Sequence, residues 1–199
     1  MRILPMGDHA VLVEDPPGGP AAWSRGVRAH RIDGVVDIVP AARTVLVRWA
    51  AGASGELMLD VLRSLRPIGD GIDVQEVVIP VRYDGPDLSA VADDTGLSAD
   101  QVVALHIGAA YEVAFCGFAP GFGYLTGLPR PLQLPRRATP RTVVPAGSVA
   151  IAAGYAAVYP GASPGGWHLL GTTDLVLFDP DRDPPALLTP GTRVRFEPA

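Results

Sequence analysis

Four arginines within one proline-rich segment could bind an anion. Arg130, Arg136, Arg137 and Arg141 all fall in residues 117–141, GFAPGFGYLTGLPRPLQLPRRATPR. The prolines restrict the backbone, and a guanidinium group binds a carboxylate or a phosphate through paired hydrogen bonds. The segment therefore indicates a site for an acid substrate or a nucleotide, or alternatively a solvated face or a subunit interface. We expect the last three arginines to share one surface.

Two turns rich in glycine and aromatic residues are expected to line one pocket. The first turn covers residues 120–124 and the second covers residues 165–168. Glycine lets a ligand approach the backbone, and Phe122, Tyr124 and Trp167 can form apolar walls around a small ring. The alternative is that these aromatic side chains only plug one end of a barrel.

Two residues are candidates for a catalytic role, His168 and Arg141. Imidazole titrates near neutral pH, so His168 could exchange a proton with a ligand, although it could equally be a packed residue at a barrel rim. His106 is a further candidate, but its place at the end of a predicted helix favours a structural role near the last carbonyl groups. The histidines show no metal-ligand spacing, so we expect no metal site formed by this chain.

A third glycine-containing turn, with Pro145, Gly147 and Ser148, could present backbone N–H groups to an anion. It is not a P-loop, because the chain contains no lysine. The full set of candidate ligand-binding residues is Phe118, Pro120, Gly121, Phe122, Tyr124, Arg136, Arg137, Pro145, Gly147, Ser148, Gly165, Gly166 and Trp167.

Composition narrows the class of protein. The net charge of −5 argues against nucleic acid as a partner, since binding phosphates requires a basic face. The single cysteine, Cys116, excludes an intrachain disulfide and suits a reducing compartment. We find neither a secretion signal nor an apolar run long enough to span a membrane, so the cytoplasm is the expected location.

The elements that must position these residues fall into two predicted domains. Residues 1–82 are expected to form a small α+β domain of ferredoxin-like layout, with strands at 2–4, 10–14, 35–39, 44–49 and 74–83 and helices at 21–32 and from Ser54. Residues 83–199 are expected to begin with two short helices, the second opened by a capping box at residues 98–101. Short strands separated by glycine and proline then predict a closed β-barrel.

Several ordered segments of the second domain resemble the family of 5-oxoprolinase B subunits. They are GFAPGFGYL, PRRATPR, VPAGSVAIA, YPGASPGGWHLLG, LFDP and PPALLTPGTRVRF. The same family includes sporulation kinase inhibitors and proteins labelled allophanate hydrolase subunit 1. The sequence departs from the usual family pattern at Gly123, at Tyr155 and at residues 171–174.

The resemblance implies a fold, a reaction and partners. The second domain would be a cyclophilin-like barrel, and the chain would pair with a carboxyltransferase-like C subunit and work beside an A subunit in a hetero-oligomer. Together they would open 5-oxoproline, a small acid, to glutamate with ATP and Mg²⁺, and arginines and backbone donors would stabilise the transferring phosphoryl group. The chain alone would be inactive. Two alternatives are an interaction protein that inhibits a histidine kinase, and a carboxyltransferase-like module of a urea or allophanate pathway, which would need a biotinylated partner.

Overall fold

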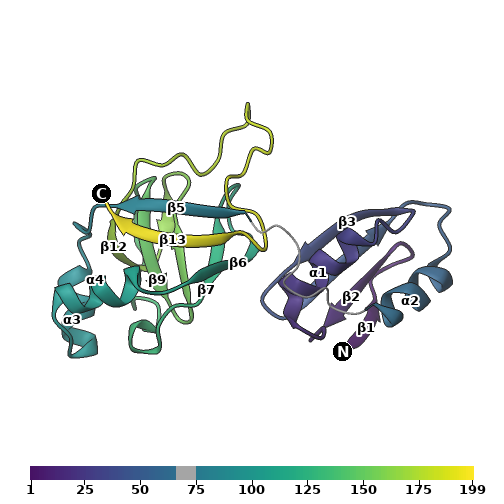
Figure 1. The fold of residues 1–199 in the computed structure, drawn as a ribbon, viewed down its shortest axis with the longest axis horizontal. Helices are drawn as coiled ribbons and strands as arrows, with labels where there is room; N and C mark the ends of the chain where they lie inside the picture. Colours follow the sequence, from purple (N-terminus) through teal and green to yellow (C-terminus); the bar gives the residue numbers. More distant parts are fainter. Residues whose placement is uncertain (66–74) are drawn as a thin grey trace. The chain divides into compact units, whose positions relative to one another are not determined.

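The computed structural model describes residues 1–65 and 75–199, and the chain divides into two compact units, Met1–Asp73 and Val74–Ala199 (Figure 1). Each unit has its own hydrophobic core. The first residue of the strand predicted at 74–83 lies outside the described residues.

The first unit is an antiparallel sheet with two helices. Its elements are β1 (Arg2–Pro5), β2 (Ala10–Glu14), α1 (Gly19–Ala29), β3 (Val35–Pro40), β4 (Thr44–Trp49) and α2 (Gly55–Ser64). The strand order is β1-β2-β4-β3. Ser54 caps α2 as predicted, because its side chain accepts a hydrogen bond from the backbone N–H of Leu57 at 3.3 Å. The helices pack Trp23, Val27, Met58 and Leu62 against the buried strand residues.

The ferredoxin-like layout expected for this unit is present with one exchange of strands. The run from β2 through α1, β3 and β4 to α2 follows the β-α-β-β-α part of that fold. A ferredoxin-like fold then returns a last strand to the position beside its first. Here β1 occupies that position, pairing with β2 from Arg2↔Glu14 to Pro5↔Val11. The strand that follows α2 is therefore left free to join another sheet.

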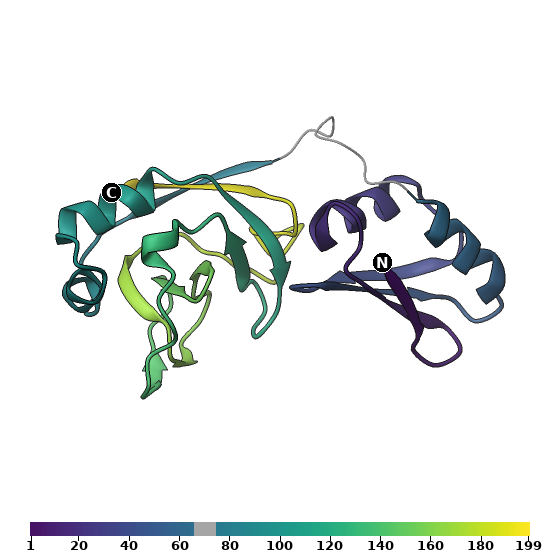
Figure 2. The ribbon, with the colours of Figure 1, turned by 90° about the horizontal axis from the view of Figure 1, so that it is seen from below.

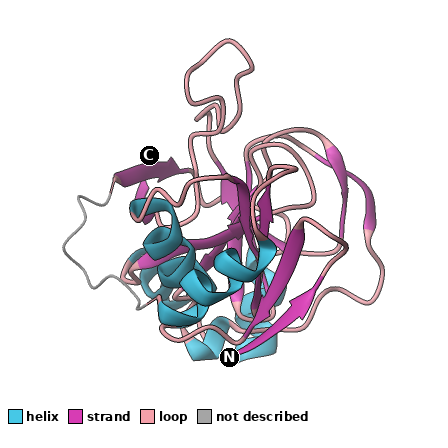
Figure 3. Ribbon diagram, turned by 90° about the vertical axis from the view of Figure 1, so that its right-hand side faces the viewer, coloured by secondary structure: helices cyan, strands magenta, loops and turns pink. Residues whose placement is uncertain are grey.

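The second unit is a seven-stranded barrel with two helices against it (Figures 1 and 2). Its elements are β5 (Glu76–Val81), α3 (Leu88–Thr95), α4 (Ala99–Ile107), β6 (Tyr111–Cys116), β7 (Gly123–Thr126), η1 (Arg130–Leu132), β8 (Arg141–Val144), β9 (Ser148–Ala152), β10 (Tyr155–Val158), β11 (Ser163–Gly165), β12 (His168–Thr172) and β13 (Arg193–Pro198). The main sheet has the order β12-β9-β10-β7-β6-β13-β5, while β8 and β11 form a small sheet of their own. The connection from β12 to β13 projects from the barrel as a long loop (Figures 1 and 3).

The segment after β5 closes the barrel. Arg82 exchanges two backbone hydrogen bonds of 2.8 Å with Thr172, so the last strand of the sheet meets β12, the first. The chain continues along β12, where Gly85 N–H donates to Leu170 O at 3.1 Å and Asp87 N–H donates to Leu169 O at 3.1 Å. The predicted closed barrel is thus confirmed, and its closure depends on residues 82–87.

The predicted domain boundary is wrong by one strand. It placed residues 1–82 in the first domain and 83–199 in the second, but β5 pairs in parallel with β13 over its whole length, from Glu76↔Arg193 to Val81↔Pro198. Its residues Val77, Ile79 and Val81 are buried in the barrel core. The strand therefore belongs to the second unit, and a strongly β-branched segment could not reveal from its own sequence which sheet it would join.

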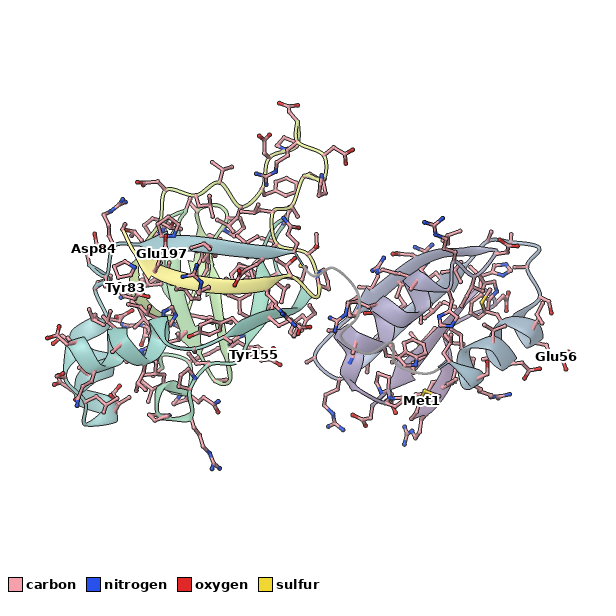
Figure 4. All side chains as sticks on the ribbon, in the orientation of Figure 1. Met1, Glu56, Tyr83, Asp84, Tyr155 and Glu197 are labelled. Atoms are coloured by element: carbon pink, nitrogen blue, oxygen red, sulfur yellow. The ribbon has the colours of Figure 1, made fainter. Side chains whose placement is uncertain are left out.

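His106 is a core residue of the barrel unit. It lies in the last turn of α4, whose predicted capping box is formed by Ser98 and Gln101. The imidazole is 0% exposed, and its Nδ1 shares a hydrogen bond of 2.8 Å with the Tyr83 hydroxyl. Tyr83, labelled in Figure 4, follows β5 in the chain. Burial lowers the pKa of His106 to about 3, so the ring is neutral at neutral pH. These contacts favour the structural role over a ligand-binding one.

Replacement of Gly85 by Ala is expected to destabilise the barrel strongly. A Cβ at this position would overlap the backbone of Leu169 and Leu170, which cannot move without opening the barrel closure. We expect a loss of about 3 kcal/mol or more in the free energy of unfolding, measured by urea denaturation and circular dichroism. Gly161→Ala is the matched control, because a Cβ there meets no atom within 4 Å. Equal stability of the two variants would contradict this account of the closure.

Burial of neutral His106 predicts a loss of stability in acid. The unfolded chain takes up a proton near the ordinary histidine pKa of 6.5, whereas the folded chain does so only near 3. The unfolding free energy should therefore fall with decreasing pH, with a slope approaching about 1.4 kcal/mol per pH unit. Denaturation of the wild type and of His106→Gln between pH 6 and 4.5 tests this prediction. The variant should lose this part of the slope, and an unchanged slope would show that His106 is not its source.

Candidate functional site

The two predicted turns line one pocket at the barrel, as expected. Its volume is about 250 Å³. Seven of the candidate residues line it, namely Phe118, Phe122, Tyr124, Arg136, Gly165, Gly166 and Trp167. The remaining lining residues are Tyr159, Pro140 and Pro164. The first turn precedes β7 and the second joins β11 to β12, so strands that are separate in the sheet deliver the two sides of the pocket.

Aromatic rings in edge-to-face contact form the inner wall. The ring centroid of Phe122 lies 5.7 Å from that of Trp167 at an angle of 90°, and 5.2 Å from that of Tyr159 at 81°. Tyr124 contacts both Phe122 and Trp167 in the same manner. Edge-to-face contacts fix the orientation of each ring, so the wall is a rigid apolar surface. The same rings are part of a small core with the alanines of β9 and β10.

Phe118 stands at the pocket with a strained backbone. Its φ is 70°, a left-handed conformation that is rare for a bulky residue, and its side chain is 61% exposed. The ring meets Phe122 edge to face at 5.2 Å. Such a conformation costs about 1–3 kcal/mol and is found mostly at binding and active sites. The strain holds an apolar ring in contact with solvent beside the pocket.

Three lining residues carry a charged group or a phenol hydroxyl, namely Arg136, Tyr124 and Tyr159. Arg136 is exposed and forms no hydrogen bond or ion pair with the residues that the structure describes. Burial raises the pKa of Tyr159, while the charges of Arg136 and Arg141 and the backbone N–H of Trp167 oppose the shift. The phenol therefore stays protonated and can donate a hydrogen bond next to a cationic group.

Arg137 and Arg141 both form ion pairs with the buried carboxylate of Asp87. The carboxylate of Asp87 is 2% exposed and accepts hydrogen bonds from Arg141 at 2.8 and 2.9 Å, from Arg137 at 2.6 Å and from the backbone N–H of Leu169 at 2.8 Å. Burial alone would raise the pKa of Asp87, but the hydrogen bonds and charges of its partners outweigh it, and the pKa is lowered. Of the three arginines expected on one anion or partner surface, two are therefore paired with a carboxylate of the protein itself, because a buried carboxylate must be paired.

His168 does not line the pocket. Its side chain is buried, and its Nε2 lies 2.8 Å from the carbonyl oxygen of Pro135, to which a protonated Nε2 donates. Successive side chains of an extended strand point in opposite directions, so Trp167 and His168 cannot both face the pocket. The hydrogen bond of His168 thus connects β12 to the loop residue that precedes Arg136. The catalytic role predicted for His168 has no support from this position, and Arg141 is likewise held by Asp87.

The expected anion nest at residues 145–148 is a structural turn. Gly147 N–H donates to Tyr159 O at 2.8 Å, and Ser148 N–H donates to Pro145 O at 3.4 Å. A nest needs N–H groups free to meet an anion, and these are already bonded. Two other candidates also lie outside the lining: Pro120 is exposed, and Gly121 packs against Phe178.

Two important residues escaped the sequence interpretation. Tyr159 begins the segment YPGASPGGWHLLG, and its position as an aromatic residue before Pro-Gly could have marked it as a pocket residue. Asp87 had no comparable signal, because its partners lie 50, 54 and 82 positions away in the sequence. Only the closed barrel brings these groups together.

Neither a nucleotide nor a metal ion fits the groups of this pocket. The pocket volume is below the range typical of sites for larger ligands, and two of the three clustered arginines already bind Asp87. Within residues 1–65 and 75–199, no group of three His, Cys, Asp or Glu side chains could hold a metal ion. In the same ranges, no helix is long and apolar enough to cross a membrane.

Comparison with known proteins places both units in a carboxyltransferase-type domain. A family model described as carboxyltransferase domain, subdomain C and D, matches residues 1–188. The 5-oxoprolinase B subunit of Escherichia coli O157:H7 is 44% identical over 210 residues, covering 99% of this chain and 95% of the relative. The chain therefore belongs to the carboxyltransferase C and D subdomain family, in the group that includes the 5-oxoprolinase B subunits.

Solved structures share the fold. The crystal structure of TTHA0988 matches with a TM-score of 0.82 and 38% identity, covering 96% of this chain but only 40% of TTHA0988. The chain thus spans less than half the length of that protein. The urea carboxylase of Kluyveromyces lactis matches with a TM-score of 0.67 and 21% identity, over 99% of this chain and 21% of the enzyme, which shows a common fold.

The buried ion triad predicts a large effect of Asp87→Asn. The amide keeps the shape of the side chain but leaves Arg137 and Arg141 without their anion. We expect a loss of about 3 kcal/mol in the free energy of unfolding, at the low end for a broken buried ion pair because the arginines retain solvent contact. Asp174→Asn is the matched control, since Asp174 forms an exposed pair with Arg82. Its thermal melt should stay close to wild type, and similar losses in both variants would contradict the special role of Asp87.

Proposed function

We propose that this chain is the B subunit of a multi-subunit 5-oxoprolinase, which opens the ring of 5-oxoproline to give glutamate. The observation that carries the proposal is the 44% identity to a protein named as the B subunit of 5-oxoprolinase, over nearly the whole of both chains. A second relative of the same name, from Haemophilus influenzae, covers 98% of this chain at 36% identity. The pocket supports the proposal, because it offers apolar walls of a size suited to a small acid, beside an arginine that has no partner among the described residues.

The chemistry explains why such an enzyme needs ATP. An unstrained lactam is a poor electrophile, and phosphorylation of its amide oxygen supplies a good leaving group. We propose that ATP and Mg²⁺ are bound mainly by the partner proteins. The absence of lysine throughout the chain and the small pocket both support this division of roles. The contribution of this chain would be to bind and orient the acid.

The proposed partners are a carboxyltransferase-like C subunit and an A subunit. The length of TTHA0988 supports at least one of them, because this chain matches only 40% of that single polypeptide. In such a protein, a domain like this chain is joined covalently to further sequence. We propose that this chain associates with a partner that supplies such further sequence. The cytoplasm is the proposed compartment, supported by a single cysteine that is free.

A carboxyltransferase-like role in urea metabolism is the second candidate. The family description and the fold shared with urea carboxylase favour it. Because this chain contains no lysine, the biotin of such a reaction would have to be attached to another protein. The higher identity to the 5-oxoprolinase relatives makes 5-oxoproline the preferred substrate.

Reconstitution tests the proposed function. The purified chain alone should show no ATP hydrolysis that depends on 5-oxoproline, whereas the chain combined with the A and C subunits should release ADP and glutamate in equal amounts. The complex without this chain is the control and should be inactive. Turnover by the isolated chain, or full activity of the control, would overturn the proposal. Biotin-dependent carboxylation by the complete complex would instead favour the second candidate.

A further inference from the structure

Arg136 differs from the two arginines that follow it in the same segment. Arg137 and Arg141 donate to Asp87, whereas Arg136 lines the pocket and has no partner among the described residues. Tyr159 supplies a hydroxyl at the same pocket. Gly165 makes room for that hydroxyl, because a Cβ at residue 165 would overlap it. Among the lining residues, Arg136 thus supplies the cation, and Tyr159 and Tyr124 supply phenol hydroxyls.

The size of the pocket restricts its ligand. A volume of about 250 Å³ corresponds to roughly eight water molecules at about 30 Å³ each. A ring of five or six atoms with one carboxylate has room in such a space. A nucleoside triphosphate has several times as many atoms and would extend well beyond this pocket.

We infer that this pocket binds a small ring carrying a carboxylate, with Arg136 paired to the carboxylate, Tyr159 hydrogen-bonded to it and the ring lying against Trp167 and Phe118. The identification of that ring acid as 5-oxoproline rests on the proposed function. The assignment of Arg136 as the carboxylate-binding residue rests on the pocket itself. The arrangement separates the acid site from the nucleotide site, which would lie elsewhere in the complex.

Phe118 gives an independent reason to expect a ligand. If the aromatic side chains only plugged one end of the barrel, a bulky ring that is mostly exposed and held at a φ of 70° would add nothing to that packing. Strain of this kind persists where the side chain has a binding role. Glycine at this position would relieve the strain and remove the ring. Phe118→Gly should therefore weaken ligand binding without lowering the stability of the fold.

Binding to the full-length chain tests the inference directly. The probe is 5-oxo-L-proline, compared with 2-pyrrolidinone, which has the same lactam ring without the carboxylate. In ¹H–¹⁵N NMR spectra, 5-oxoproline should shift the indole resonance of Trp167 and leave those of Trp23 and Trp49, which lie in the core of the first unit, unchanged. Pyrrolidinone should bind at least tenfold more weakly.

Three variants separate the contributions. Arg136→Gln should weaken 5-oxoproline binding at least tenfold and leave pyrrolidinone binding unchanged. Arg130→Gln is the matched control, because Arg130 is in the same segment but does not line the pocket, and it should bind both compounds as wild type does. Phe118→Gly should weaken the binding of both compounds with a melting temperature equal to or above that of wild type.

Kinetics of the reconstituted complex distinguish failure of this inference from failure of the proposed function. Arg136→Gln should raise KM for 5-oxoproline at least tenfold with KM for ATP unchanged. An active complex in which Arg136→Gln and Arg130→Gln have the same KM values would overturn the inference and leave the function intact. A complex with no 5-oxoproline-dependent activity would remove the function. The inference would then stand only if the isolated chain still binds the ring acid more tightly than pyrrolidinone through Arg136.

Discussion

The barrel unit depends on one buried carboxylate. Asp87 lies at the end of the segment that closes the barrel, where its own N–H donates to Leu169 O and its carboxylate accepts from Leu169 N–H. The same carboxylate binds Arg137 and Arg141, which lie next to the pocket residues Arg136 and Pro140 in the sequence. A single side chain therefore joins the closure of the sheet to the position of the pocket loop. Its burial is tolerated because three separate donors satisfy it.

Close backbone packing explains why the closing segment can follow β12 so tightly. Gly85 faces the backbone of Leu169 and Leu170, and Gly171 faces that of Arg82, with no space for a Cβ at either position. The edges of an open sheet would otherwise leave hydrogen-bonding groups unpaired. Closure satisfies those groups and fixes β12, and β12 in turn carries the turn that contains Trp167. The rigidity of the aromatic wall is thus a consequence of how the barrel closes.

Sequence reasoning succeeded where the determining contacts are local. The capping box of Ser98 and Gln101 spans four residues and was predicted correctly, as were the strands at 10–14 and 44–49. It failed where pairing is distant. The β-branched pattern of β5 is compatible with either sheet, and its parallel partner β13 lies more than a hundred residues later. The roles of Arg137 and Arg141 were missed for the same reason. The sequence around Asp87 indicates only the start of a helix, and the two arginines lie 50 and 54 positions later.

In the proposed site, three arginines that are near in sequence are divided between structure and ligand binding. Asp87 neutralises one of the two charges that it binds, so the pair with its carboxylate keeps a net positive charge next to the pocket. That charge acts on Tyr159 together with Arg136. Arg136 itself needs no carboxylate from the protein, because solvent can reach it until a ligand arrives. In the proposed site, the ion triad would therefore assist anion binding without touching the anion. It fixes the loop that carries Arg136 and adds a positive potential around that guanidinium.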